Sequence, residues 1–335
     1  MFIAEDLNQF KQLFVTRLKG MLSDDELGAF ILVLANSHQD QFLQGELESD
    51  LKKTFLVLRD NFIAGKLDAT HDDIEVFEQL LELELSDIPV WQNRVVGDWE
   101  VTYNAMRRLR PARASSQVLN SINQPYDGSK FHFNKPFLKP EILWEGESEG
   151  VNSRVLFNKF PFSEYHLLIV LSPEKNCSQL LTWTDHQYVC SLADKLAEVF
   201  PGFGLGFNSL AAGASVNHLH FQGFVRERSF AIERSHWLHN DGEMEYPLTV
   251  KRFSDAGSSW DYLQQLISHD EAFNCLYRGR YCYVVPRRYQ GSVVLPGWLD
   301  GAGWIDVAGA VTVSESETYG RLTKEQVATG IGLLR

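Results

Sequence analysis

The chain has 335 residues, 44% of them hydrophobic, which is enough for a large core or for two closely joined domains. Its 44 acidic residues outnumber 31 Lys and Arg residues, and the net charge of -13 argues against general nucleic-acid binding, which needs a basic face. No apolar run is long enough to span a membrane, and the acidic start from Met1 to Asp6 does not resemble a signal peptide, so we expect a cytoplasmic protein.

Residues 1–90 are predicted to form a mostly helical N-terminal extension. Ser23 to Glu26 has the form of a capping box, and apolar residues follow it at helical spacing. Asp72 and Asp73 precede a second such stretch. No side chain here indicates chemistry, so we expect a scaffold or an oligomer contact.

Residues 91–145 differ in composition from the extension. Positive charge is concentrated there in an otherwise acidic chain, at Arg94, Arg107, Arg108, Arg110 and Arg113. Proline interrupts regular structure from Pro111 onward, and Lys130 to Lys135 alternates as a strand would.

Residues 152–230 predict an antiparallel sheet with helices on one side, an α+β fold. Four strands are expected, at 154–158, 166–171, 204–210 and 217–225. Between the second and third, Thr184 and Gln187 suggest a capping box that opens a helix with an apolar stripe.

The last hundred residues repeat a similar pattern. Strands are expected at 246–253, 277–285 and 304–313, a helix at 260–267, and a terminal helix capped by Thr323 and Gln326. We therefore expect two related halves, a catalytic half at 91–230 and a second copy without its histidines at 231–335.

The chemistry-bearing residues lie in the segment from Asn217 to Gln222. In a strand, successive side chains point to opposite faces, so His218, His220 and Gln222 share one face, about 7 Å apart. A neutral imidazole is a competent nucleophile near pH 7, and a glutamine can donate a hydrogen bond to a phosphoryl oxygen without carrying charge. This spacing suits attack on phosphorus.

Two other interpretations of the histidine pair stay open. His-x-His on a strand is also a metal-ligand pair, although no further histidine or cysteine cluster completes a site, and Cys177, Cys190, Cys275 and Cys282 contain no CxxC pair. The pair could also be purely structural. The small residues from Asn208 to Ser215 favour phosphate chemistry, because they allow backbone N–H groups to approach an anion. Gly202, Gly204 and Gly206 precede a strand and do not form a dinucleotide fingerprint.

The run from Gly206 to Gln222 resembles the active-site segment of the galactose-1-phosphate uridylyltransferase branch of the histidine-triad superfamily, where His-x-His-x-Gln replaces a third histidine. Within that branch it is most similar to the GDP-hexose phosphorylases and the diadenosine tetraphosphate phosphorylases. The resemblance covers roughly residues 100 to 320, with supporting segments at 104–111, 124–133, 158–170 and 304–309.

The resemblance implies a nucleotidyltransferase of the phosphorylase type, acting on a nucleotide-sugar or a dinucleoside polyphosphate. His220 would be the nucleophile that forms a covalent nucleotidyl-histidine, Gln222 would hold the nonbridging oxygens, and His218 would support the site. Phosphate is the expected acceptor. The implied substrate-binding residues are Asn158, Lys159, Asn208, Ser209, Gly213, Ser215, Asn217 and Arg110.

The spacing of the motif favours the GDP-hexose branch. His218 lies ten positions after Asn208, and Val216-Asn217 stands where the diadenosine enzymes carry proline. Leu219 stands where the uridylyltransferases carry proline. We expect no cofactor, although a divalent cation can accompany the substrate, and no nucleic-acid or membrane partner. A homodimer is compatible with the sequence. The alternatives are a non-catalytic nucleotide-binding protein that keeps the fold, and a metal-dependent phosphohydrolase.

Overall fold

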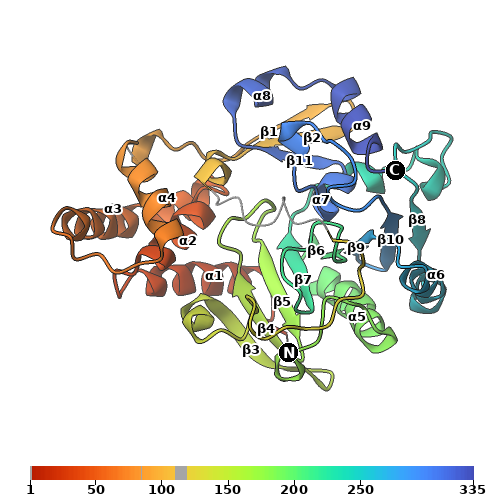
Figure 1. Ribbon diagram of the computed structural model, residues 1–335, viewed down its shortest axis with the longest axis horizontal. Coiled ribbons are helices and arrows are strands. Elements are labelled where there is room, and N and C mark those ends of the chain that lie inside the picture. Colours follow the sequence, from red (N-terminus) through yellow and green to blue (C-terminus); the bar gives the residue numbers. More distant parts are fainter. Residues whose placement is uncertain (1, 84, 110–118) are drawn as a thin grey trace.

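The computed structural model describes residues 2–83, 85–109 and 119–335 (Figure 1). Within these ranges, no helix combines the length and the apolar character that crossing a bilayer requires. The chain forms helices and two sheets, so the predicted α+β class is confirmed.

The N-terminal extension is helical, as predicted. Its helices are α1 (Leu7–Met21), α2 (Leu27–Ser37), α3 (Gln41–Ile63) and α4 (His71–Leu81). The predicted capping box at the start of α2 is wrong: Glu26 is the N-cap without a side-chain cap bond, and Ser23 Oγ donates to Gly20 O at the end of α1. The extension shares the core of the sheet, because Phe10 and Phe14 pack against Tyr165.

The main sheet has eight strands, and every pairing within it is antiparallel. In spatial order they are β3 (Ile142–Ser148), β4 (Val151–Phe157), β5 (Leu167–Leu171), β7 (His220–Val225), β6 (Phe203–Asn208), β9 (Phe273–Arg278), β10 (Tyr281–Pro286) and β8 (Lys251–Phe253).

A smaller sheet lies above the main one in Figure 1. It consists of β1 (Gln92–Val96), β2 (Trp99–Tyr103) and β11 (Ala310–Val313), and β11 runs parallel to β2. Each sheet therefore takes strands from both predicted halves, and β6 pairs directly with β9. The division into extension, catalytic half and second copy stays a prediction.

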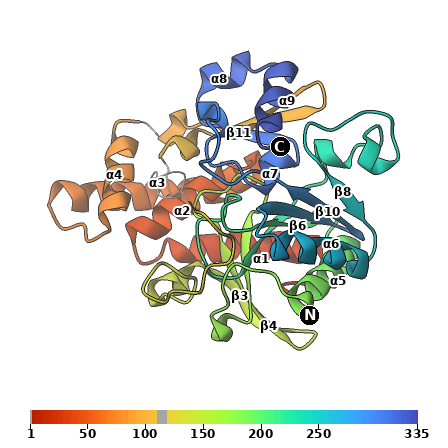
Figure 2. The same cartoon turned by 45° about the vertical axis from the view of Figure 1, so that its right-hand side comes forward.

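Helices cover the main sheet on both faces. The helices α5 (Trp183–Val199) and α6 (Ala256–Ser268) pack against each other on one face of it (Figures 1 and 2), and α7 (Trp304–Val307) contacts β6 and β9. Phe221 of β7 belongs to the core that includes α5, whereas Phe224 belongs to the core that includes Trp304. The strand β7 therefore presents alternate side chains to two different layers. The remaining helices are α8 (Ser316–Arg321) and α9 (Lys324–Gly332), with short 3-10 turns at Leu85–Asp87, Ala105–Leu109, Pro136–Glu141, Pro173–Lys175, Ala231–Glu233, Leu238–Asn240 and Gly297–Leu299.

Several predicted boundaries are corrected. Lys130 to Lys135 is not a strand, because turns interrupt it: Lys130 N donates to Asp127 O, and Lys135 N donates to His132 O. The predicted strand at 304–313 divides into α7 and β11, since Asp306 accepts from Gly303 N and closes a helical turn. The strand predicted at 246–253 is reduced to β8. The capping box of α5 is formed by Thr182 and Asp185, and the predicted box of the terminal helix α9 is confirmed.

Candidate active site

Strand β7 places His220 and Gln222 on the face of the main sheet opposite α5. His220 pairs with Val170 of β5, and Gln222 pairs with Gly206 of β6. Phe221 between them points into the helical core. The predicted alternation along this strand is confirmed for His220 and Gln222, but β7 begins at His220, so His218 lies before the ladder.

The hydrogen bonds of His220 fix which ring nitrogen carries the proton. His220 Nδ1 lies 2.8 Å from the backbone oxygen of His218, which can only accept a hydrogen bond. The neutral ring therefore has its proton on Nδ1 and a lone pair on Nε2. Burial lowers the pKa of His220 to about 4, against a smaller opposing effect of the bond to His218. The ring is neutral at pH 7, with Nε2 able to attack.

A buried glutamine holds the backbone of His220. The side chain of Gln179 accepts from His220 N at 2.9 Å and donates to His220 O at 3.1 Å. It also donates to Asn208 O at 2.9 Å, so one amide joins the start of β7 to the end of β6. Sequence analysis missed Gln179, because nothing in its neighbourhood distinguishes it from a surface glutamine.

His218 is held from the opposite side, by the segment before β3. Its Nδ1 accepts from Phe133 N at 3.2 Å, and the Phe133 ring lies 5.8 Å away in a stacked arrangement. The Tyr126 ring also contacts it, at 5.5 Å. Burial is the main cause that lowers the pKa of His218 to about 4, and the neighbouring His220 adds to it. His218 is therefore a neutral ring whose Nε2 carries the proton.

The segment that carries Phe133 is itself anchored to the sheet. Arg154 of β4 donates to Phe133 O and to Asn134 Oδ1, both at 2.9 Å. Asn217 crosses to the same region: its Oδ1 accepts from Gln179 N, and its Nδ2 donates to Pro125 O at 2.8 Å. The predicted substrate residue Asn217 thus holds two loops together in this structure.

Gln222 is oriented by residues that lie far away in the sequence. Trp304 Nε1 donates to Gln222 Oε1 at 2.7 Å. The imidazole of His166, fully buried, also hydrogen-bonds to the Gln222 side chain, and burial lowers the pKa of His166 to about 3. Both partners were missed by sequence analysis, although Trp304 and His166 lie in segments that supported the family resemblance.

The predicted phosphate loop from Asn208 to Ser215 begins with two buried side chains. Asn208 Oδ1 accepts from Trp304 N at 2.7 Å and from Asn274 Nδ2 at 2.6 Å. Ser209 Oγ accepts from Phe273 N at 3.0 Å, which ties the loop to β9. Gly213 has a φ of +97°, and a Cβ there would approach Ala302 O to 2.8 Å, so a glycine is required. Ser215 is exposed.

Asn158 and Lys159 lie at the turn between β4 and β5. Asn158 makes internal contacts, since its Oδ1 accepts from Phe160 N at 3.0 Å and its Nδ2 lies 3.4 Å from the His166 ring. Lys159 forms a 2.6 Å ion pair with Asp73 of the extension. Arg110, like Pro111 and Arg113, lies outside the described residues.

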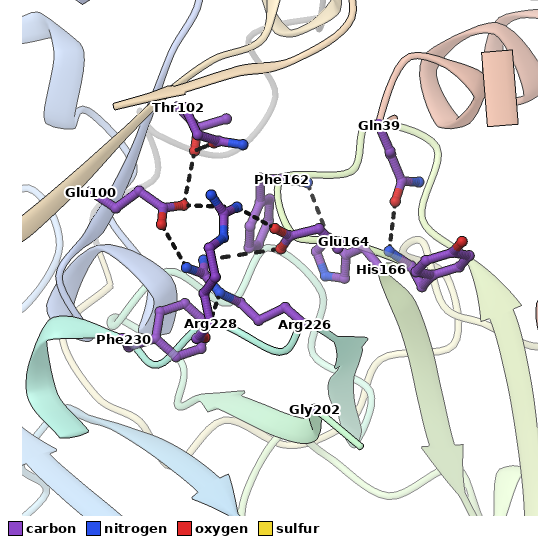
Figure 3. Close-up of polar contacts among 12 residues, drawn as sticks. Gln39, Glu100, Thr102, Phe162, Glu164, His166, Gly202, Arg226, Arg228 and Phe230 are labelled. Atoms are coloured by element: carbon purple, nitrogen blue, oxygen red, sulfur yellow. Dashed lines mark hydrogen bonds and ion pairs between the residues drawn. The ribbon is translucent and has the colours of Figure 1, made fainter. Parts of the chain in front are cut away.

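Charged residues at the far end of β7 anchor the turn that carries His166 (Figure 3). The buried Arg226 pairs with Glu100 of β2 at 2.7 Å, and Arg228 pairs with Glu164 at 2.7 Å. From the extension, Gln39 accepts from the backbone of Tyr165 at 2.6 Å. The turn next to Gln222 is therefore held by the small sheet, by β7 and by the helical extension together.

The arrangement allows nucleophilic attack by a neutral imidazole beside an amide donor. Within the described parts of the chain, no three His, Cys, Asp or Glu side chains gather as a metal site. The four cysteines are free thiols. Of the predicted catalytic residues, the structure brings His218, His220 and Gln222 to one region, with Asn208 joined to it through Gln179 and Trp304.

Residues 95–224 match the family model described as "GDPGP1-like, N-terminal domain". The chain is 38% identical to GDP-D-glucose phosphorylase 1 of Danio rerio over 124 residues, which are 37% of this chain and 35% of that protein. It is 31% identical to GDP-D-glucose phosphorylase 1 of Homo sapiens, over 37% of this chain and 33% of that protein. It is 30% identical to GDP-L-galactose phosphorylase 1 of Arabidopsis thaliana, over 39% of this chain and 33% of that protein.

The matched region spans about a third of the length of these curated relatives. Among solved structures, yeast Ap4A phosphorylase Apa2 is similar with a TM-score of 0.49 and 15% identity, over 78% of this chain and 94% of that chain. The matched region contains the whole His-x-His-x-Gln motif. Over residues 95–224 the chain is thus similar to the GDPGP1-like domain, and the resemblance to the GDP-hexose phosphorylases that its motif predicted is confirmed.

Proposed function

We propose that this protein is an enzyme that splits a GDP-hexose with inorganic phosphate, through a covalent nucleotidyl-histidine at His220. The single observation that carries the proposal is the hydrogen bond from His220 Nδ1 to His218 O. This bond places the ring proton on Nδ1 and leaves the lone pair on Nε2. It supports nucleophilic catalysis because a displacement at phosphorus needs an unprotonated nucleophile at working pH.

The proposed reaction has two displacements at the same phosphorus. In the first, His220 Nε2 attacks the phosphorus that bears the nucleoside, the N–P bond forms, and the bond to the bridging oxygen breaks, which releases hexose 1-phosphate. In the second, an oxygen of inorganic phosphate attacks that phosphorus and the P–N bond breaks. The products are GDP, hexose 1-phosphate and the original neutral His220.

The neighbours of His220 have distinct proposed roles. The hydrogen bond from Nδ1 to His218 O stabilises the positive ring that exists while the nucleotide is attached. His218 supports the departing phosphate from its protonated Nε2, and Gln222 donates its amide to a nonbridging oxygen. Proposed contacts to the nucleotide and its phosphates come from Asn158, Lys159, Asn208, Ser209, Gly213, Ser215, Asn217 and Arg110.

The substrate class rests on the relatives. Those named in the comparison are GDP-D-glucose phosphorylase and GDP-L-galactose phosphorylase. We propose that no cofactor takes part in the covalent step, although a divalent cation can accompany the substrate phosphates. Four free cysteines suit a reducing compartment, and we propose that the protein works in the cytoplasm.

The test incubates the full chain with GDP-D-glucose, GDP-L-galactose or diadenosine tetraphosphate, each with and without phosphate, and separates the nucleotides by chromatography. We expect phosphate-dependent GDP from a GDP-hexose, no turnover by His220→Ala, and full turnover by His269→Asn, an exposed histidine at the end of α6. Turnover that requires no phosphate, that disappears on chelation of the protein alone, or that survives in His220→Ala would contradict the proposal.

A further inference from the structure

The indole of Trp304 occupies a fixed position on the catalytic face of the sheet. It is fully buried, it stacks on Phe224 at 4.9 Å with an interplanar angle of 13°, and its backbone N–H donates to Asn208 Oδ1. A Cβ at Gly206 would lie 2.2 Å from its ring atoms. Gly206 is therefore the residue that leaves room for the indole directly opposite Gln222.

This position determines how the Gln222 amide is turned. An indole N–H is only a donor, so the Gln222 atom 2.7 Å from Trp304 Nε1 has to be the carbonyl oxygen. The amide Nε2 of Gln222 then points away from Trp304. A glutamine without such a partner could present either its oxygen or its nitrogen to a phosphate, and only the nitrogen is attractive to an anion.

The imidazole of His166 lies beside the same side chain and hydrogen-bonds to it. Its Nδ1 accepts from Phe162 N at 3.3 Å, so the proton of the neutral ring lies on Nε2. The hydrogen bond between the two side chains favours the protonated form of His166, as expected when the imidazole is the donor. The His166 ring is fully buried, and Phe162 packs edge-on against it at 4.2 Å.

We propose that Trp304 is a positioning residue for the reaction, which holds the oxygen of Gln222 and so aims its amide N–H at a nonbridging oxygen on the phosphorus that His220 attacks. Trp304 comes from α7, far along the chain from the histidine motif. The C-terminal segment is then required for the motif to work, even though it carries none of the three motif residues. This inference rests on the proposed function for the reaction that it serves.

The first test removes the indole N–H and keeps an aromatic ring. For Trp304→Phe we expect kcat of phosphorolysis to fall about tenfold, the effect of losing one hydrogen bond of ordinary strength, with little change in the KM for GDP-D-glucose. The matched control is Trp237→Phe. Trp237 is also buried and its Nε1 donates to Ala231 O at 2.7 Å, so its removal costs a similar bond away from Gln222.

The second test asks whether Trp304 acts through Gln222. In a Gln222→Met background, Trp304→Phe should cause no further loss of kcat, because the group that Trp304 orients is already absent. A tenfold loss in both backgrounds, or equal kcat in Trp304→Phe and Trp237→Phe, would overturn the inference and leave the proposed function intact.

A third measurement does not depend on activity or on the folding of Trp304→Phe. In the ¹⁵N-labelled full chain, one indole N–H resonance should move upfield and lose protection from solvent exchange in Gln222→Met, while the other indole resonances stay in place. If no indole resonance responds, the bond is absent and the inference fails. If the wild type splits no substrate, the proposed function fails, and this resonance still decides whether Trp304 holds Gln222.

Discussion

The two ends of the catalytic stretch, His220 and Gln222, are held in different ways. At the His220 end, the proton is fixed by a backbone oxygen two residues away, within the motif itself. At the Gln222 end, the amide is fixed by Trp304, which is 82 residues away. The protonation of the proposed nucleophile is therefore set locally, with Gln179 holding its backbone. The orientation of the proposed phosphate-binding amide depends on the packing of a distant part of the chain.

Buried neutral histidines lie at both ends, so acid should lower the free energy of unfolding of the protein. The pKa values of His218 and His220 are lowered to about 4, that of His166 to about 3, and that of His186 to about 4, all mainly by burial. At a pH below about 6.5, the ordinary histidine pKa, these histidines bind protons in the unfolded chain but stay unprotonated in the folded chain. Stability that is fully present above that pH is then lost as pH falls toward 4.

Two buried carboxyl groups oppose this loss. Burial raises the pKa of Asp306 to about 6 and that of Glu141 to about 7, so the folded chain holds protons there that the unfolded chain releases. Four histidines outweigh two carboxyls, and each unbalanced proton contributes about 1.4 kcal/mol per pH unit. Urea unfolding should give a clearly smaller free energy of unfolding at pH 5 than at pH 7. An equal or larger value at pH 5 would mean that the histidines are not held neutral.

Gln179→Leu should disturb the backbone around His220 and leave the Gln222 amide in place. It removes three buried hydrogen bonds and leaves His220 N–H and two carbonyl oxygens without this partner, so we expect a loss of about 3 kcal/mol in the free energy of unfolding. Turnover should fall more than for Gln39→Leu, a buried glutamine that contacts Tyr165 instead. Equal turnover in the two variants would show that His220 does not need its backbone clamp.

Gly206→Ala should disturb the Gln222 end alone. The new methyl group overlaps the Trp304 ring, which has to shift, and overpacking of this kind costs about 1 to 3 kcal/mol. Gly223→Ala is the matched control, because its methyl group would meet the flexible end of Ile169 on the opposite face. Turnover and thermal unfolding of both variants should show a kcat loss for Gly206→Ala only. An unchanged kcat in Gly206→Ala would argue that the indole position is not critical.

The smallest effect is expected where the helical extension meets the site. Asp73→Asn breaks the ion pair with Lys159, which is partly exposed, so the expected cost is at most about 1 kcal/mol. Glu149→Gln, which removes the surface partner of Lys195, is the control. The free energies of unfolding of the two variants, measured by chemical denaturation, should agree within about 1 kcal/mol. A much larger loss for Asp73→Asn would mean that the extension supports the catalytic region through this pair.

Patterns among neighbouring residues in the sequence predicted much of the secondary structure. The helical periodicity before residue 90, the antiparallel strands around the motif, and the shared face of His220 and Gln222 were all confirmed. These features depend on spacing within a single element, which the sequence displays directly. The cap of α9 was predicted for the same reason.

Contacts between distant elements could not be predicted in this way. His218 lies before the strand that was expected to include it, and its ring accepts a hydrogen bond from Phe133 N. Phe133 belongs to a segment whose own strand prediction was wrong. Gly206 was noted as part of a discarded nucleotide fingerprint and as the first residue of the resembling run, and neither pattern showed that it leaves room for Trp304. Such roles follow from which side chains meet in space, and no local spacing encodes that.

The covalent step is the central claim, and one measurement tests it most directly. The full chain is mixed briefly with GDP-D-glucose without phosphate, denatured at alkaline pH, digested, and analysed by mass spectrometry. The account predicts a GMP adduct on His220, lost in acid, absent from His220→Ala and removed as GDP when phosphate is added before denaturation. Phosphate-dependent turnover without any adduct on His220 under these conditions would contradict it.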